Sequence, residues 1–314
     1  MRAGTDAPAA SVDTADGHNA ARRLLARLPW WLRWWAGRYL DLWGAVATIT
    51  VITSISNPPR GSGVESQVLA GVLLLALPWV RQRWWAWGLL TVVTAFGVFS
   101  HVLVDLDNHH FLHVYWLAAL TVACLARDPA WTLGRAGRLL VGWLFLFATL
   151  WKLLTPDFTD GAFLAYLLSI DRNLTRIPIA LDWVDPDITS ENRIAVTAMR
   201  HDPEVEPHPV PVQVSPTIDR LATPLSLLTL ALEAAVALTF LLPLRGAWTR
   251  WREVSLFAFV LVTYPALPVL SFAALLIAMS LAATTMRAPW AQISHVAVLL
   301  AVWGMSEALR AFVG

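Results

Sequence analysis

Apolar runs of membrane-spanning length, separated by short polar segments, are the main pattern along this chain. A helix needs about 20 mainly apolar residues to cross the hydrocarbon core, and fewer where flanking side chains reach the interface. Nine runs fit: roughly residues 39–56, 67–80, 85–104, 111–126, 138–155, 222–244, 254–269, 271–286 and 291–309. The seventh and eighth meet at TYPALPVLSF, whose two prolines make either a tight turn or a broken helix. The pattern predicts an all-α, polytopic integral membrane bundle of eight or nine transmembrane helices.

The arginines predict which loops face the cytoplasm, because short cytoplasmic loops carry an excess of Lys and Arg. With the N-terminus inside, the inner segments hold Arg22, Arg23, Arg27, Arg33, Arg38, Arg81, Arg83, Arg127, Arg135, Arg138, Arg245, Arg250, Arg252 and Arg287. The short outer loops hold only Arg60. Residues 156–221 also carry arginines, but long loops cross the membrane largely regardless of charge. We therefore expect a cytoplasmic N-terminus.

The same pattern divides the chain into regions. Residues 1–20 lack an apolar core and are expected to be a disordered cytoplasmic tail, not a signal peptide. Residues 21–38 are a basic segment that either lies on the membrane surface or simply flanks the first span. The rest divides into a first transmembrane block at 39–155, an extracytoplasmic loop at 156–221 and a second block at 222–312. In the loop, 161–170 predict a short interfacial or re-entrant helix, and EVEPHPVPVQVSP predicts extended chain.

The composition fits a membrane location and removes several function classes. Of 314 residues, 57% are hydrophobic and 14% charged, whereas about a quarter of a soluble domain is charged. The net charge of +1 offers no basic excess for nucleic acid. Cys124 is the only cysteine, which excludes an internal disulfide and a cysteine-rich metal site. We expect an integral protein of a bacterial plasma membrane, surrounded by membrane lipid.

Lys152 is the first candidate for chemistry, because it is the only lysine beside 22 arginines. It lies near the outer end of a predicted span, in LFLFATLWKLLTP. Lysine can give up its proton when it is desolvated, whereas a guanidinium stays charged. A desolvated amine can serve as a general base or a nucleophile. The alternative is a lysine whose ammonium only reaches up to the interface.

A second polar cluster lies at the outer ends of the third and fourth predicted spans. Its members are His101, Asp105, Asp107, Asn108, His109, His110 and His113. Pairs four residues apart can share a helical face. Three interpretations stay open: a proton relay or cofactor site, a metal site, and a polar loop with hydrogen-bonded histidines. The remaining histidines are scattered singly, which argues against a di-iron centre with many histidine ligands.

Glu233 falls near the middle of the sixth predicted span, in LLTLALEAAVALTF. A carboxylate at that depth must be paired or protonated, because an isolated charge in low dielectric is costly. It is therefore a partner of Lys152 or of a histidine, a proton carrier, or a neutral acid hydrogen-bonded between helices.

Two stretches carry a family resemblance. Asn108-His109-His110-Phe111-Leu112 lies at one helix end, and Lys152-Leu153 followed by Asp157-Phe158-Thr159-Asp160-Gly161 lies at a later one. In order, separation and outer placement they resemble vitamin K-dependent γ-glutamyl carboxylase and its bacterial relatives, the horizontally transferred transmembrane domain family. That family has Asn-His-Tyr-Tyr-Leu at the first place. At the second it has Lys-Leu, then Asp, an aromatic residue and Gly.

The resemblance implies a carboxylase-like membrane enzyme that acts on reduced vitamin K or a similar menaquinol-like quinol at the outer leaflet. In that family the lysine matching Lys152 deprotonates the quinol, which then reacts with oxygen to give a strong base. That base removes a proton from substrate glutamate before carbon dioxide adds. We assign Lys152, His109, His110 and Glu233 as catalytic candidates. Asn108, His113 and Asp157 are candidates for holding the quinol, and we expect no metal.

The chain also departs from the family pattern. Ala148-Thr149 stand where a glycine is usual, and His110-Phe111 stand where two tyrosines are usual. The carboxylase continues into a large lumenal part that binds its substrate's propeptide. We therefore expect the quinol chemistry, with a lipid-soluble small molecule as partner, and leave a peptide or protein substrate on the extracytoplasmic side open. The alternative function is non-enzymatic, either a transporter or a partner-binding or assembly subunit.

Overall fold

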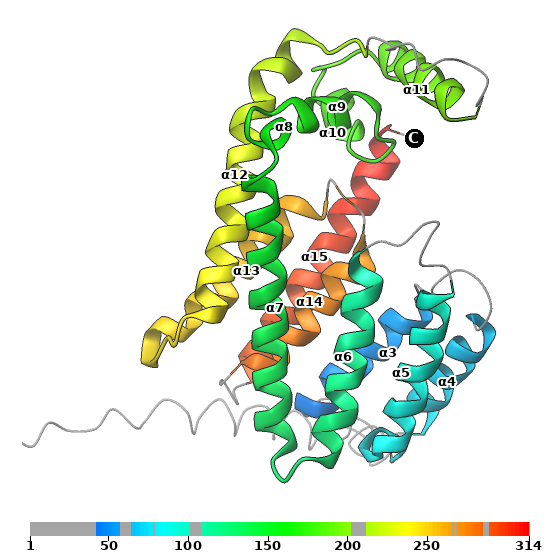
Figure 1. The fold of residues 1–314 in the computed structure, drawn as a ribbon, viewed down its shortest axis with the longest axis vertical. Coiled ribbons are helices and arrows are strands. Elements are labelled where there is room, and N and C mark those ends of the chain that lie inside the picture. Colours follow the sequence, from blue (N-terminus) through cyan, green and yellow to red (C-terminus); the bar gives the residue numbers. More distant parts are fainter. Residues whose placement is uncertain are drawn as a thin grey trace, which may run out of the picture.

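The computed structural model describes residues 42–56, 64–77, 79–100, 108–201, 212–265, 267, 269–284 and 289–313. These residues form helices joined by turns, with no strand among them (Figure 1). The α-helices are α3 Leu42–Ser56, α4 Val64–Ala76, α5 Trp84–Phe99, α6 Asn108–Leu125, α7 Pro129–Leu153, α8 Pro156–Thr159, α9 Ala162–Ile170, α10 Arg176–Ala180, α11 Pro186–His201, α12 Pro216–Leu241, α13 Trp251–Thr263, α14 Leu270–Ala283 and α15 Pro289–Val313. Two 3₁₀-helices, η1 Val80–Gln82 and η2 Gly246–Arg250, join α4 to α5 and α12 to α13. The all-helical fold is thus confirmed for the described residues.

Every apolar run predicted from the sequence contains a helix, but α7 and α12 begin well before the predicted runs, at residues 129 and 216 instead of 138 and 222. The helix α7 begins at Pro129, where the Asp128 side chain accepts a hydrogen bond from the Trp131 amide at 3.0 Å. The helix α12 begins at Pro216 after Ser215, whose hydroxyl accepts from the Ile218 amide at 3.2 Å. An N-cap side chain followed by proline at the first helical position starts a helix even where the sequence is not yet apolar.

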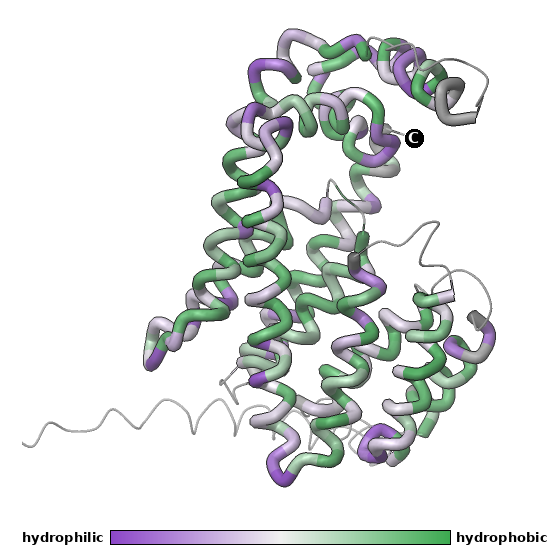
Figure 2. Tube along the Cα trace, viewed as in Figure 1, coloured by the Kyte–Doolittle hydropathy of each residue, from purple (hydrophilic) through white to green (hydrophobic). Residues whose placement is uncertain are grey.

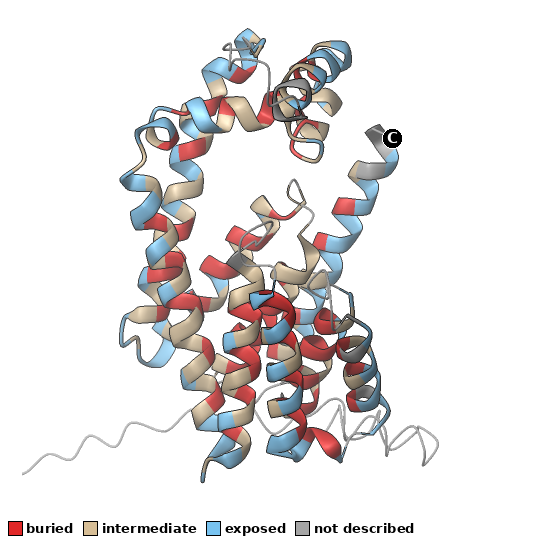
Figure 3. Cartoon of the chain, turned by 45° about the vertical axis from the view of Figure 1, so that its right-hand side comes forward, coloured by how far each residue is buried: buried red, intermediate tan, exposed pale blue. Residues whose placement is uncertain are grey.

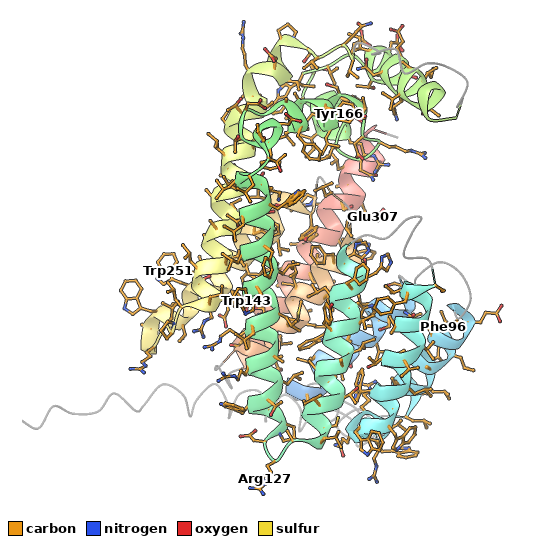
Figure 4. The ribbon with its side chains drawn as sticks, viewed as in Figure 1. Phe96, Arg127, Trp143, Tyr166, Trp251 and Glu307 are labelled. Carbon is orange, nitrogen blue, oxygen red and sulfur yellow. The ribbon has the colours of Figure 1, made fainter. Side chains whose placement is uncertain are left out.

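Three described helices are long and apolar enough to cross a membrane: Pro129–Leu153, Pro216–Leu241 and Ala291–Leu309. Shorter apolar helices cover Trp43–Ser56, Trp84–Phe99, His109–Leu125 and Leu270–Ala283. Hydrophobic residues follow these helices along most of their length, and polar residues gather at their ends (Figure 2). Large apolar side chains also point away from the bundle, as Phe96 and Trp251 do in Figure 4. A surface of this kind suits lipid.

The long helix α7 packs against α6, α12 and α14, so it joins the helices of the first half of the chain to those of the second half. Close approach to α14 requires glycine, because a Cβ added at Gly137 would lie 2.5 Å from the carbonyl oxygen of Met279. The helix α14 is enclosed by protein, with Ala273 and every residue from Leu275 to Ala282 buried. Figure 3 shows buried residues gathered in the interior of the bundle. This core fixes α7 and α12, which carry the candidate site.

The segment between α7 and α12 was predicted to contain one short helix, and α9 lies within a residue of the predicted range. The segment holds α8, α10 and α11 as well, which the search for apolar runs could not find because these helices are short or largely polar. The helices α8 and α9 pack at the upper end of α7 and α12 in Figure 1, while α11 contacts α9 and α10 contacts α15. Residues 212–215 are not helical, in agreement with the expected extended chain. The rest of that proline-rich stretch before α12, the tail 1–20 and the basic segment 21–38 lie outside the described residues.

Arg81 was expected in a polar loop, but it is only 2% exposed. Its Nε donates to the Leu74 carbonyl at 2.7 Å and its Nη1 donates to the Thr48 hydroxyl at 2.8 Å. The indole of Trp87 donates to the Arg81 carbonyl at 2.7 Å. The guanidinium therefore satisfies carbonyl and hydroxyl groups at the turn between α4 and α5, and this arginine has a structural role in addition to its charge.

Candidate functional site

Lys152 lies in the last turn of α7, at the end next to α8. The helix ends at Leu153 because Pro156 follows three residues later, and the residue before a proline disfavours helical backbone. The chain then turns and enters α8, which brings Phe158 back toward the lysine. The Lys152 Nζ lies 5.1 Å from the centroid of the Phe158 ring, within the range of a cation–π interaction.

The Lys152 ammonium forms an ion pair with Glu233 of α12, in which Nζ donates a hydrogen bond to Oε1. The two side chains are 24% and 7% exposed, respectively. The sequence left Glu233 with either Lys152 or a histidine as partner, and the structure selects Lys152. The helices α7 and α12 lie side by side along most of their length, and the pair connects them near the end next to α8 (Figure 1).

The second oxygen of Glu233 differs from the first. Glu233 Oε2 is buried and has no hydrogen-bond partner among the described residues. A buried carboxylate oxygen normally accepts at least one hydrogen bond, and leaving it without one costs free energy. This oxygen atom therefore has unused capacity to accept a hydrogen bond.

The turn beside Lys152 is held tightly against α12. Gly161 has a φ of +91°, and a Cβ added there would lie 2.5 Å from the amide nitrogen of Thr223. The Thr223 hydroxyl donates to the carbonyl of Asp160 at 2.5 Å. Only glycine fits this combination of left-handed backbone and close approach. Gly161 of the family-like stretch thus fixes Phe158 and the lysine relative to Glu233.

A row of aromatic rings leads from the end of α13 to the first turn of α6. Tyr264 lies near enough to Glu233 to be affected by its charge. The Tyr264 and Phe272 ring centroids are 6.0 Å apart, and Phe272 is in turn 6.0 Å from His109. The rings of His109 and His110 lie 4.2 Å apart. The rings therefore form a row from Tyr264 through Phe272 to His109, and Tyr264 is within range of the Glu233 charge.

The three residues chosen for holding a quinol have different surroundings. His113 is 4% exposed and its Nε2 lies 2.8 Å from the Ser54 hydroxyl, so this histidine faces α3. Asp157 is exposed in the first turn of α8, close in sequence to Phe158. Asn108 is the first residue of α6. Of the three, Asp157 is the one whose helix packs next to the lysine.

No group of three His, Cys, Asp or Glu side chains within the described residues could hold a metal ion. His101, Asp105 and Asp107, which belong to the polar cluster picked from the sequence, lie outside the described residues. His295, a scattered histidine, is buried with its Nε2 3.1 Å from the Ser280 hydroxyl and its Nδ1 2.6 Å from the Ala291 carbonyl oxygen.

Sequence reasoning missed Tyr264 and Phe272, and it gave Phe158 no role of its own. Aromatic residues are frequent in the apolar runs, so nothing in the local pattern distinguishes these three. The one available signal was the position of Tyr264 in TYPALPVLSF, where the prolines already predicted a break between two helices. Comparison with protein-family models, with curated proteins and with solved structures gives no match for this chain.

Proposed function

We propose that this chain is a polytopic enzyme of a bacterial plasma membrane, with eight or nine spans and a cytoplasmic N-terminus. In this proposal it resembles the transmembrane part of vitamin K-dependent carboxylase, and Lys152 acts as a base on a lipid-soluble quinol at the outer leaflet. The observation that carries the proposal is the ion pair of the single lysine with a buried glutamate, between two long apolar helices.

The arrangement of the helix ends supports the proposed topology. The end of α7, the start of α12 and the end of α15 lie at the same end of the molecule, next to α8–α11 (Figure 1). Arg127, in the turn between α6 and α7, lies at the opposite end (Figure 4). An arginine-bearing turn at one end and the long segment at the other agree with the positive-inside rule for a cytoplasmic N-terminus.

The pair gives Lys152 a way to act as a base. An amine accepts a proton only when it is neutral. Lys152 can become neutral by passing a proton from Nζ along the existing hydrogen bond to Glu233 Oε1. In a low-dielectric site the neutral amine–acid pair avoids the desolvation cost of two charges, so the two forms can be close in free energy. The neutral Nζ then accepts a proton from a substrate hydroxyl.

The residues around the pair fit a quinol. The buried ring of Phe158 lies 5.1 Å from Lys152 Nζ, Tyr264 is within range of the Glu233 charge, and Glu233 Oε2 lacks a hydrogen-bond donor among the described residues. Phe158 would contact the ring, and Lys152 Nζ would take up the proton of one quinol hydroxyl while Glu233 keeps the proton that the lysine released. A bound quinol supplies an acidic hydroxyl and, in the family that the sequence resembles, the reaction with oxygen.

The test compares wild-type protein with Lys152→Arg and Lys152→Ala. Purified protein in nanodiscs is supplied with a reduced naphthoquinone, and oxygen uptake and epoxide formation are measured. We expect both variants to be inactive, because guanidinium remains protonated at the working pH. A small added amine should partly restore Lys152→Ala and leave Lys152→Arg inactive. Trp151→Phe, at the exposed neighbouring position, is the matched control and should keep its activity.

A Lys152→Arg variant as active as wild type would refute the role as base, since a purely structural cation tolerates arginine. Wild-type protein that neither binds the quinone nor consumes oxygen would instead favour the non-enzymatic alternative, a transporter or a partner-binding subunit.

A further inference from the structure

A pocket of about 510 Å³ lies at the end of α12 that is remote from Lys152. It is formed where η2 connects α12 to α13, and the end of α14 closes one side. Phe240, Ala247, Arg250, Arg252, Glu253 and Thr284 are among the residues that line it. None of the residues proposed to act on a quinol lines this pocket.

Two of the lining residues are arginines, and they are held in different ways. Arg252 is 7% exposed, and its Nε donates to the carbonyl of Thr239 at 3.0 Å. Its Nη2 donates to the carbonyl of Leu242 at 3.3 Å, so the guanidinium is fixed over the end of α12. Arg250 is exposed at the rim, where its Nε donates to the Ala247 carbonyl at 3.2 Å.

A third cation, Arg138 on α7, does not line the pocket but is close enough to Arg252 for the two charges to repel each other. The Nε of Arg138 is buried and has no hydrogen-bond partner in the part of the chain that the structure describes. Two guanidinium groups held close together, one of them with an N–H donor that lacks an acceptor, favour the binding of an anion.

The only acidic residue lining the pocket is Glu253. Its Oε1 accepts a hydrogen bond from the Thr284 hydroxyl at 2.7 Å. One carboxylate does not balance Arg250, Arg252 and the neighbouring Arg138. The pocket therefore keeps a positive potential.

The surroundings of the pocket are those of a membrane interface. Phe240 and Ala247 give it apolar walls. Trp248 and Trp251, on either side of Arg250, are 66% and 50% exposed. Trp251 points away from the bundle (Figure 4). Exposed indoles beside arginines at the end of apolar helices are typical of the headgroup level.

We propose that this pocket binds a phosphate group through Arg250 and Arg252, with either the headgroup of an anionic phospholipid or a free phosphate as its source. Guanidinium groups match phosphate oxygens with two parallel hydrogen bonds. Basic pockets between transmembrane helices on the cytoplasmic side bind such headgroups, and the arginine distribution predicts that this end is cytoplasmic. The proposal is independent of the quinol chemistry at the other end of α12.

The test uses the purified full chain. Native mass spectrometry measures binding of phosphatidylglycerol and of phosphatidylcholine, and calorimetry measures binding of inorganic phosphate. We expect phosphatidylglycerol to bind at least tenfold more tightly than phosphatidylcholine. Arg250→Gln should weaken that binding about fivefold, the contribution expected of one arginine at a headgroup. Arg127→Gln is the control, since it removes the same charge from another exposed turn predicted to face the cytoplasm.

Arg250 is the main variant because its guanidinium is exposed and bonds only within its own turn among the hydrogen bonds described, so its loss should leave the fold intact. Arg252→Gln is the second variant, with circular dichroism to show that it folds. Phosphatidylglycerol binding that falls in both variants and not in Arg127→Gln supports a lipid headgroup. Inorganic phosphate binding with the same dependence, without preference between the lipids, supports a free phosphate. Absence of both, or equal binding by wild type and Arg250→Gln, overturns the proposal.

Discussion

Removing the Lys152 ammonium should destabilise the protein in a way that depends on pH. In Lys152→Met the Glu233 carboxyl, 7% exposed, loses its ion-pair partner. An unpaired carboxylate in such surroundings is neutralised by protonation. From the reference Glu pKa of about 4.3, protonating it costs about 3.7 kcal/mol at pH 7 and about 1 kcal/mol at pH 5. The free energy of unfolding should therefore fall relative to wild type by up to these amounts.

The direction of this pH dependence follows from the number of protons bound in the folded and in the unfolded state. In folded Lys152→Met the carboxyl holds a proton that the unfolded chain releases above about pH 4.3. The stability of the variant must then decrease as the pH rises, by about 1.4 kcal/mol per unit. Wild type has Lys152 and Glu233 with the same total number of protons in both states between pH 5 and 8, so this pair adds no slope there.

The assay is equilibrium unfolding by guanidinium chloride in a non-ionic detergent, followed by tryptophan fluorescence at pH 5, 6, 7 and 8. The double variant Lys152→Met/Glu233→Gln is the control, because it removes both charges. It should lack the pH-dependent loss and be more stable than Lys152→Met at pH 8. The presence of a buried pair of charges would be refuted if Lys152→Met lost the same free energy of unfolding at every pH. It would also be refuted if the double variant were as unstable as Lys152→Met at pH 8.

Three further predictions concern the fold. Gly161→Ala should lower the free energy of unfolding by more than about 1 kcal/mol, since it adds a side chain to left-handed backbone against α12; Gly304→Ala, on an open helical face, should be neutral or stabilising. Gly137→Leu should separate α7 from α14 and lower the thermal midpoint in detergent by several degrees. An unchanged thermal midpoint would contradict the close contact between α7 and α14. In a cysteine-free background, a membrane-impermeant maleimide should label Asp187→Cys in intact cells and Arg127→Cys only after permeabilisation; the reverse result would overturn the proposed topology.

Much of the fold could be predicted from the sequence, because long apolar helices depend on local composition. The helix α9 was expected at 161–170 and is found at Ala162–Ile170. The helix α11 was missed since its polar residues and modest length resemble a loop in a hydropathy pattern. The start of α7 was missed because Asp128 and Pro129 define a helix start through capping, which apolar periodicity does not detect.

The candidate site was predictable in part. Lys152 and Glu233 could be singled out, because a charge inside an apolar run is costly wherever the run packs. The position of Tyr264 near Glu233 could not be predicted, since it depends on where α13 ends relative to α12. His113 was grouped with His109 and His110 by sequence proximity. On the helix it turns toward α3 and bonds Ser54, which only the packing of α6 determines.

The enclosure of α14 has a consequence for biosynthesis. A helix that enters the membrane during translation is first surrounded by lipid and by the helices made before it. The helix α14 is apolar yet gives almost none of its surface to lipid, and its partners α3 and α7 precede it by far in the chain. Until residue 270 emerges, the face of α7 at Gly134 and Gly137 has no α14 to pack against. This part of the core is therefore completed late, when α14 packs between helices that were made before it.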